Sequence, residues 1–351
     1  MLIREQVPLA PLTTLGVGGP ARFFIEAGTL DEVVEAVGFA HARQLPLFVL
    51  GGGSNLVVAD NGFPGVVLKV GIVDVSHLTA ANGEVIFDAG AGVDWDAFVA
   101  ETIEAECAGL ECLSGIPGTV GGTPVQNVGA YGQEVAETIR EVRALDLRSL
   151  ESKTLSNAEC QFSYRSSLFN TTERGRGRYI ILRVSFALRQ GGRPGLRYAE
   201  LQEVFANDSV EPTLAEVRAA VLEIRRCKGM LIVPGEDDSR SAGSFFKNPI
   251  VPMPVFTELA ARMEAHGWQL PSYPLGDGFR KLPAAWLVEL AGFPRGYSKG
   301  AAGISRRHAL AIINRGGATA ADIMALKENI QARVKDEFEI ELQPEPVFVG
   351  F

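Results

Sequence analysis

The stretch that decides the fold is SGIPGTVGGTPVQNVGAYG, residues 114–132, which carries six glycines and two prolines. Glycine lets the backbone approach a ligand closely and point successive N–H groups at an anion. Three further glycine segments occur: GVGGPA (16–21), GGGSN (51–55) and GAG (90–92). Each segment alone is equally well explained as a tight turn, but the four together favour a dinucleotide site.

The known nucleotide motifs narrow the type of site. GAG follows the strand-like run EVIFDA but lacks the third glycine of the Rossmann G-x-G-x-x-G, and so does GVGGPA. No G-x-x-x-x-G-K-[ST] occurs, which excludes a P-loop. GGGSN lies between the apolar runs PLFVL and LVVAD, so it fits a turn that cradles a pyrophosphate, with Ser54 and Asn55 as added side-chain donors.

The composition sets wider limits. A chain of 351 residues is longer than one core supports, so two or three domains are expected. The net charge of −9 argues against binding to nucleic acid or to an anionic membrane. The four cysteines lack metal-ligand spacing, so no metal is expected. No signal peptide or membrane span is visible, which predicts a cytoplasmic protein, and we expect a monomer.

The periodicity predicts mixed helices and strands. A strand is expected at 21–27, followed by a helix with Thr29 and Glu32 in capping-box register. A β-rich middle follows, interrupted by a helix near 94–107. After a break at 191–195 helices dominate, the first over 213–228 with a second capping box at Thr213 and Glu216, and the chain ends in a strand pair within 339–350.

The stretch 114–132 resembles the UDP-N-acetylenolpyruvoylglucosamine reductases, flavoenzymes of peptidoglycan synthesis in the vanillyl-alcohol-oxidase-like FAD-binding superfamily. The resemblance continues in family order through TTLGVGGPARFF, LGGGSNLVVAD, CQFSYRSSLF, RSAGSFFKNP, HALAIIN and LQPEPVFVG. It implies an α+β fold with a two-part FAD-binding module of the vanillyl-alcohol-oxidase type and a smaller C-terminal α+β substrate-binding domain. The expected FAD subdomains are 1–70, to which 342–351 returns, and 71–228; the substrate-binding domain is 229–341.

The resemblance also implies a reaction. It is the NADPH-dependent reduction of UDP-N-acetylglucosamine enolpyruvate to UDP-N-acetylmuramate, with FAD as the cofactor. Adding hydride to the vinyl carbon puts negative charge on the carbon that bears the carboxylate. The site therefore needs cations or hydrogen-bond donors at the carboxylate and an acid for that carbon.

Three residues match the family's catalytic groups. Arg165 in FSYRSS would clamp the substrate carboxylate, and Ser244 in SAGSFFKNP would be the general acid. Glu345 in QPEPV would position the carboxylate network or relay a proton. Taken alone, these residues are equally a strand-edge arginine, a serine in a strand packed by Phe245 and Phe246, and an exposed glutamate. A nucleophilic serine needs an adjacent base, and no G-x-S-x-G elbow is present.

Two larger sets of residues follow from the resemblance. The substrate contacts would be Tyr131, Tyr198, Lys228, Asn248, Arg295 and His308, with Tyr198 on a loop at 196–201 that folds over the diphosphate and Lys228 near the phosphates. Without the resemblance, Lys228 is a cation at a helix C-terminus. The FAD site would be formed by Gly51, Gly52, Gly53, Ser54, Asn55, Ile116, Pro117, Gly118, Thr119, Gly122 and Thr123.

Some positions depart from the family pattern. They are Gly122, Asn170, Pro346 and Val347, and they bear on fine substrate and flavin contacts rather than on the reaction class. Three other functions remain open at this point. One is an FAD-dependent oxidoreductase of the same fold with another substrate, the second a sensor that binds FAD or a nucleotide sugar, and the third a serine hydrolase.

Overall fold

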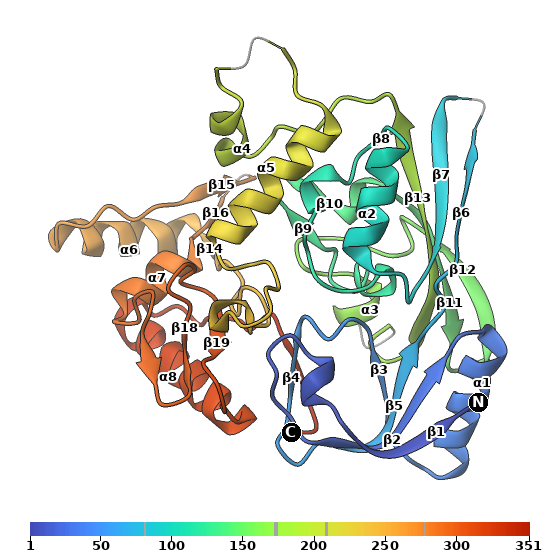
Figure 1. Cartoon of the computed structure of the whole chain (residues 1–351). Helices are drawn as coiled ribbons and strands as arrows, with labels where there is room; N and C mark the ends of the chain where they lie inside the picture. The colour runs from blue at the N-terminus through green and yellow to red at the C-terminus, as the bar shows by residue number, and fades with distance from the viewer. Residues whose placement is uncertain (81, 172–174, 208–209, 277) are drawn as a thin grey trace. The chain divides into compact units, whose positions relative to one another are not determined.

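The computed structural model describes residues 1–80, 82–171, 175–207, 210–276 and 278–351, and it divides into two compact units (Figure 1). The first unit comprises Met1–Pro8, Pro20–Gly53 and Gly62–Leu231; the second comprises Leu9–Gly19, Ser54–Asn61 and Ile232–Phe351. Both contain helices and strands, as the α+β prediction requires. The finer division into three domains stays a prediction.

A small sheet opens the first unit. Its strand order is β1-β2-β5-β3, with β1 antiparallel to β2 and the other neighbours parallel. The strands are β1 (Ile3–Pro8), β2 (Pro20–Ala27), β3 (Leu47–Leu50) and β5 (Phe63–Val70). Helix α1 (Leu30–Ala42) buries Val33, Ala36, Val37 and Ala40, which recur at helical spacing. The Thr29 side chain accepts from the Glu32 N–H as predicted, but the Glu32 carboxylate accepts from Gly28 N, so the capping box is not reciprocal.

A larger antiparallel sheet carries the core of the first unit. Its order is β12-β11-β13-β7-β6, and β8 also pairs with β13 (Figure 1). The strands are β6 (Val75–Thr79), β7 (Glu84–Gly90), β8 (Cys107–Ala108), β11 (Ile139–Asp146), β12 (Glu151–Ser156) and β13 (Tyr179–Gln190). Helix α2 (Trp95–Glu104) packs Trp95 and Phe98 onto Phe186 of β13, with ring centroids 5.9 and 5.1 Å apart.

Apart from its 3-10 turns, the remaining described elements of the first unit are short except for one helix. They are β9 (Gly129–Ala130), β10 (Gln133–Glu134), α3 (Leu168–Thr171), α4 (Ala199–Val204) and α5 (Leu214–Cys227). Helix α5 begins with the predicted capping box, in which Thr213 accepts from Glu216 N and the Glu216 carboxylate accepts from Thr213 N.

Among its described residues, the second unit packs three α-helices with short strands around a core of its own. The helices are α6 (Met253–Ala265), α7 (Ala284–Leu290) and α8 (Ala320–Phe338). The strands form three small sheets: β4 (Leu56–Val58) with β20 (Val347–Val349); β14 (Ile250–Pro252), β16 (Phe279–Lys281) and β15 (Tyr273–Leu275); and β17 (Ser298–Lys299), β18 (Ala302–Ile304) and β19 (Ile312–Asn314). No helix in the described part of the chain is long and apolar enough to cross a membrane.

The predicted strand pair at 339–350 is wrong. This segment contributes one strand, β20, which pairs in parallel with β4, and an isolated bridge from Pro344 to Phe246. Pro344 and Pro346 have no N–H to donate, so the residues before β20 cannot sustain a regular ladder.

Candidate active site

Three of the four glycine segments meet in the first unit and form what we call the glycine cradle, residues 51–53, 90–92 and 116–123. A Cβ on Gly52 would lie 2.4 Å from the Gly118 Cα, and one on Gly121 would lie 2.5 Å from the Ala91 Cβ. A backbone hydrogen bond also joins two of the segments: Gly121 N donates to Ala91 O at 2.9 Å. The glycines are therefore required because backbones pack directly on one another.

Asp96 on helix α2 binds the backbone at Gly115, immediately before residues 116–123. The Asp96 carboxylate accepts from Gly115 N at 2.6 Å and pairs with both terminal nitrogens of Arg218 on α5, at 2.6 and 2.9 Å. Burial alone would raise the pKa of Asp96, but the hydrogen bonds from Arg218 and Gly115 hold it below its usual value. Asp96 is thus a charged acceptor that fixes where the Ile116–Pro117 turn begins.

The cradle residues predicted to bind FAD differ in their hydrogen bonds, in the space beside them and in their backbone conformation. The Thr123 hydroxyl is buried and donates to Val120 O at 2.8 Å, so it stabilises the turn from within. Gly122 has open space beside it, since the nearest atom to an added Cβ is 3.9 Å away. Gly53 has φ +67°, a left-handed conformation that favours glycine.

Ser54 and Asn55 complete the GGGSN run but belong to the second unit. Asn55 Nδ2 donates to Glu345 O at 3.2 Å, and Asn55 O accepts from Val347 N at 2.9 Å. Ser54 O accepts from the Thr14 hydroxyl, which also donates to Ser241 O at 2.6 Å. These contacts tie the end of the glycine run to the segments that carry Glu345 and Ser244, and a direct role at FAD stays a prediction for both.

A flavin dinucleotide fits the glycine cradle by its chemistry. The residues at 51–53 have no side chains, so their backbone amides form the surface that a pyrophosphate would meet. The adjoining Ile116 and Pro117 are half-buried and apolar, which suits an aromatic ring system.

Three residues predicted to contact substrate lie together in the first unit. The Tyr131 and Tyr198 rings meet edge to face with centroids 5.4 Å apart, and Lys228 Nζ lies 5.6 Å from the first centroid and 5.9 Å from the second. Lys228 also pairs with Glu200 of α4. Burial alone would lower the pKa of Lys228, but the Glu200 carboxylate raises it, so the ammonium stays charged beneath the two rings.

Arg225 belongs to the same cluster, and sequence reasoning missed it. Its side chain is buried, with Nε donating to Gly115 O at 3.1 Å and Nη2 to Met230 O at 2.9 Å. Burial lowers the pKa of Arg225, while contact with the Tyr131 hydroxyl opposes the shift. The available signal was its spacing: Val217, Val221 and Arg225 recur every four residues on the buried face of α5.

Arg165 lies beside the hairpin of β9 and β10 that carries Tyr131. Its Nη2 donates to Gly129 O at 2.7 Å, and its own backbone has φ +53° in the turn that joins Ser163 to Ser166. The buried Asn127 amide fastens the same hairpin to this turn by donating to Glu134 Oε2 at 2.7 Å and to Ser163 O at 3.1 Å. The guanidinium is therefore held in place by a non-glycine backbone in a costly conformation.

Ser244 and Glu345 are neighbours in the second unit. Phe245 N donates to Leu310 O at 2.8 Å, and Phe245 O accepts from Glu345 N at 2.9 Å. The expected strand over SAGSFFKNP is wrong: the segment is irregular, with single bridges at Ser241 and Phe246. The packing prediction is confirmed, because Phe245 and Phe246 are buried in the core of the unit.

The other three predicted substrate residues are engaged within the second unit. Asn248 Oδ1 accepts from Ala284 N at 2.9 Å at the start of α7, and Arg295 pairs with Glu289 at 3.2 Å. His308 Nδ1 accepts from Leu310 N at 3.1 Å, so the tautomer that keeps this bond carries its proton on Nε2.

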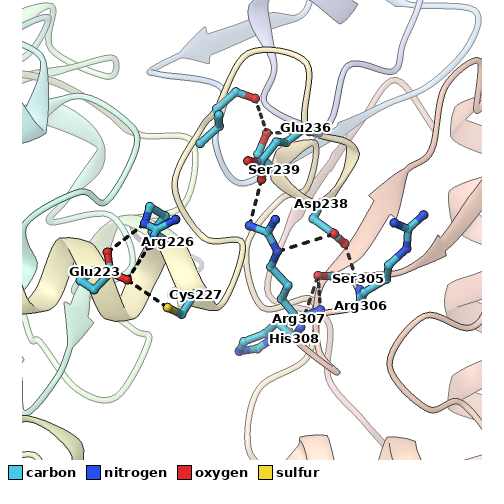
Figure 2. Close-up of polar contacts among 11 residues, drawn as sticks. Glu223, Arg226, Cys227, Glu236, Asp238, Ser239, Ser305, Arg306, Arg307 and His308 are labelled. Atoms are coloured by element: carbon cyan, nitrogen blue, oxygen red, sulfur yellow. Dashed lines mark hydrogen bonds and ion pairs between the residues drawn. The ribbon is translucent and has the colours of Figure 1, made fainter.

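Figure 2 shows how the loop before His308 is fixed. Arg307 lies between Glu236, at 2.9 Å, and Asp238, at 4.0 Å. The Ser305 hydroxyl accepts from the backbone N–H groups of Arg307 and His308. The ion pairs tie this loop to the segment that leads into Ser244.

The comparisons with known proteins match two parts of the chain to family models and nearly the whole chain to named relatives. Residues 21–149 match the model of an FAD binding domain, and residues 234–349 match that of the UDP-N-acetylenolpyruvoylglucosamine reductase C-terminal domain. The reductase of Thermobifida fusca is 47% identical over 99% of this chain and 98% of its own length, and that of Nocardia farcinica is 46% identical over 99% and 90%. A crystal structure of the reductase from Thermus caldophilus matches with a TM-score of 0.67 and 27% identity, over 99% of this chain and 100% of that one. The chain therefore belongs to the family of UDP-N-acetylenolpyruvoylglucosamine reductases, which are FAD-dependent oxidoreductases.

Proposed function

We propose that this protein reduces UDP-N-acetylglucosamine enolpyruvate to UDP-N-acetylmuramate at the expense of NADPH, as a cytoplasmic step of peptidoglycan synthesis. The observation that carries the proposal is the backbone hydrogen bond between Phe245 and Glu345, which joins the segment of the proposed proton donor Ser244 to the segment of Glu345. The match to the reductases over nearly the whole chain supports the substrate.

The cofactor would be held by the glycine cradle. Residues 51–53 and 116–119 would receive the pyrophosphate and the ring system, while Ser54, Asn55, Gly122 and Thr123 would shape the edges of the site. FAD bound there would supply the two-electron chemistry that links NADPH to the vinyl carbon. Side chains of the protein would bind the substrate and donate the proton.

The reacting end of the substrate needs a clamp and an acid. Arg165 would bind the carboxylate through two parallel N–H groups and so stabilise the charge that develops on the adjacent carbon. Ser244 would donate its proton to that carbon, a transfer that a hydroxyl can make because a carbanion is far more basic than an alkoxide. Glu345 would orient the carboxylate or relay a proton back to Ser244.

The nucleotide end needs cations and apolar surfaces. Lys228 would meet the diphosphate while Tyr131 and Tyr198 enclose it, and Asn248, Arg295 and His308 would complete the substrate contacts. On this proposal the chain divides into FAD subdomains at 1–70 and 71–228 and a substrate-binding domain at 229–341. Residues 342–351 would return to the first FAD subdomain; the pairing of β20 with β4, a strand within 1–70, supports this, although both strands group with the second unit.

The purified yellow protein should oxidise NADPH much faster when UDP-N-acetylglucosamine enolpyruvate is added, because the enol ether removes the electrons that the flavin has taken. The measurement is NADPH absorbance with and without the enol ether, with UDP-N-acetylmuramate identified by mass. Bound FAD without stimulation by the enol ether would overturn the proposal. A sensor predicts no NADPH oxidation at all, and a serine hydrolase predicts labelling by serine-directed reagents.

Arg165→Lys should lower kcat/KM for the enol ether by roughly 100-fold, because lysine keeps the charge but cannot form the bidentate pair. Reduction of bound FAD by NADPH should keep its wild-type rate, since that step has no carboxylate to clamp. The matched control is Arg143→Lys, which changes an exposed arginine of β11 in the same unit. Equal losses in both half-reactions would contradict the assigned role.

A further inference from the structure

Glu111 is a buried carboxylate that the proposed reaction does not use. It is 1% exposed, within the short 3-10 turn Glu111–Leu113. In the part of the chain that the structure describes, it forms no ion pair. Three hydrogen-bond donors point at it instead: Gly109 N at 2.8 Å to Oε2, and Gln133 Nε2 at 2.6 Å and Gly195 N at 2.7 Å to Oε1. Burying a carboxylate is costly unless hydrogen bonds compensate it, and here the three donors do so. The arrangement therefore fixes the three donor groups around one acceptor.

The two donors on Oε1 come from the two segments that carry the tyrosines. Gln133 begins β10, two residues after Tyr131, and Gly195 precedes Tyr198 by three residues. Cys112 also bonds to both segments. Gln133 Oε1 accepts from Cys112 N at 2.9 Å, and the Cys112 thiol donates to Gly195 O at 3.0 Å. One carboxylate oxygen therefore joins the bases of both segments.

We propose that Glu111 is a positioning residue for substrate binding, which fixes the segment bearing Tyr198 against the hairpin bearing Tyr131. This inference rests on the proposed function, in which both rings enclose the substrate diphosphate. The edge-to-face contact of the rings at 5.4 Å, and the place of Lys228 beside both, depend on how the two segments are spaced. Tyr198 is 41% exposed, so burial alone does not fix the position of its ring. The hydrogen bond from Gly195 N to Glu111 fixes the backbone three residues earlier.

The anchor also explains a glycine. A Cβ on Gly195 would lie 2.9 Å from Gln133 Nε2, the atom that donates to Glu111. A larger residue would make the Gln133 amide shift and so disturb the same hydrogen bond that a change of Glu111 would remove. Glu111 and Gly195 should therefore give the same functional defect when altered separately.

The test compares the holoproteins of the wild type, Glu111→Gln, Gly195→Ala and Asp146→Asn. Glutamine keeps the shape but loses the charge and sets an amide N–H₂ against one of three donors. Gly195→Ala disturbs the network while Glu111 keeps its carboxylate, so it serves if Glu111→Gln fails to fold. Asp146→Asn is the matched control, because Asp146 is a fully buried carboxylate of the same unit whose partners are Arg178 and Lys153.

Two readouts decide the matter. Hydrogen exchange at residues 195–198 should be about tenfold faster in Glu111→Gln and Gly195→Ala than in the wild type and in Asp146→Asn. KM for the enol ether should rise about tenfold in the same two variants, with kcat and the rate of FAD reduction by NADPH changed far less.

An unchanged exchange rate at residues 195–198 overturns the anchoring role of Glu111, whatever the activity of the variants is. Faster exchange with an unchanged KM, or an equal KM rise in Asp146→Asn, overturns the role in substrate binding. If the wild type does not respond to the enol ether, the proposed function fails and the exchange result alone decides whether Glu111 anchors the segment.

Discussion

Ser244→Ala is expected to leave the reduction of bound FAD by NADPH at its wild-type rate and to slow reoxidation by the enol ether by roughly 100- to 10,000-fold, the range for loss of a positioned acid. The reason is that, in the proposed mechanism, the first half-reaction needs no proton for a substrate carbon, whereas the second would leave a carbanion unless a proton is supplied. The measurement is stopped-flow absorbance of the flavin, with each half-reaction followed separately.

The control for Ser244→Ala removes another hydroxyl from the same segment. Ser241 Oγ accepts from Gly243 N at 3.2 Å, so Ser241→Ala tests whether a general disturbance of this irregular segment slows the enzyme. Reoxidation should stay near the wild-type rate in Ser241→Ala. Ser244→Cys retains an ionisable proton and should recover part of the lost rate. Loss of FAD reduction in Ser244→Ala, or undiminished reoxidation, would show that this hydroxyl is not the acid.

Gly52→Ala is expected to yield protein that loses FAD on purification. The added methyl would lie 2.4 Å from the Gly118 Cα and 2.8 Å from its carbonyl carbon, both backbone atoms that cannot move aside as a side-chain end does. Relieving such an overlap costs about 1–3 kcal/mol, which corresponds to roughly 10- to 100-fold in FAD affinity if the cradle must close to bind it. The measurement is the ratio of flavin to protein absorbance, followed by titration of the apoprotein with FAD.

Gly38→Ala is the matched control for this change. Gly38 lies on the exposed side of α1 in the same unit, and nothing is found within 4 Å of its added Cβ. Alanine there should keep the flavin and raise the unfolding free energy by about 0.5–1 kcal/mol, because glycine is the poorer helix former. A fully yellow Gly52→Ala protein with the wild-type Tm would show that the close approach of residues 52 and 118 does not shape the FAD site.

Sequence reasoning succeeded where the information is local. The capping box at Thr213 and Glu216 was predictable because both partners lie within four residues and their bonds form as soon as the helix does. The same rule half succeeded at Thr29, where the Glu32 carboxylate found Gly28 N instead. The strand pair at 339–350 failed because alternating apolar residues outweighed two prolines that lack the N–H groups a ladder needs.

At the candidate site too, the sequence pointed to some residues and did not reveal others. The sequence pointed to the residues proposed to act in the reaction, Arg165, Ser244 and Glu345, because their motifs resemble those of a known family. It did not reveal Glu111, since a glutamate between Leu110 and Cys112 reads equally as an exposed turn residue. Nor did it reveal Arg225, whose charge argued for solvent while its spacing on α5 argued for burial.

What the sequence determined by itself was the fold class, the presence of a dinucleotide site outside the Rossmann and P-loop types, and the family to which the chain belongs. Only the tertiary structure decided which glycine segments meet, since Gly52 and Gly118 come together across 65 intervening residues. It also decided that Glu111 joins the segments of Tyr131 and Tyr198. The physical reason is that a close backbone approach and a shared acceptor depend on where distant segments pack, and local patterns record only what each segment prefers alone.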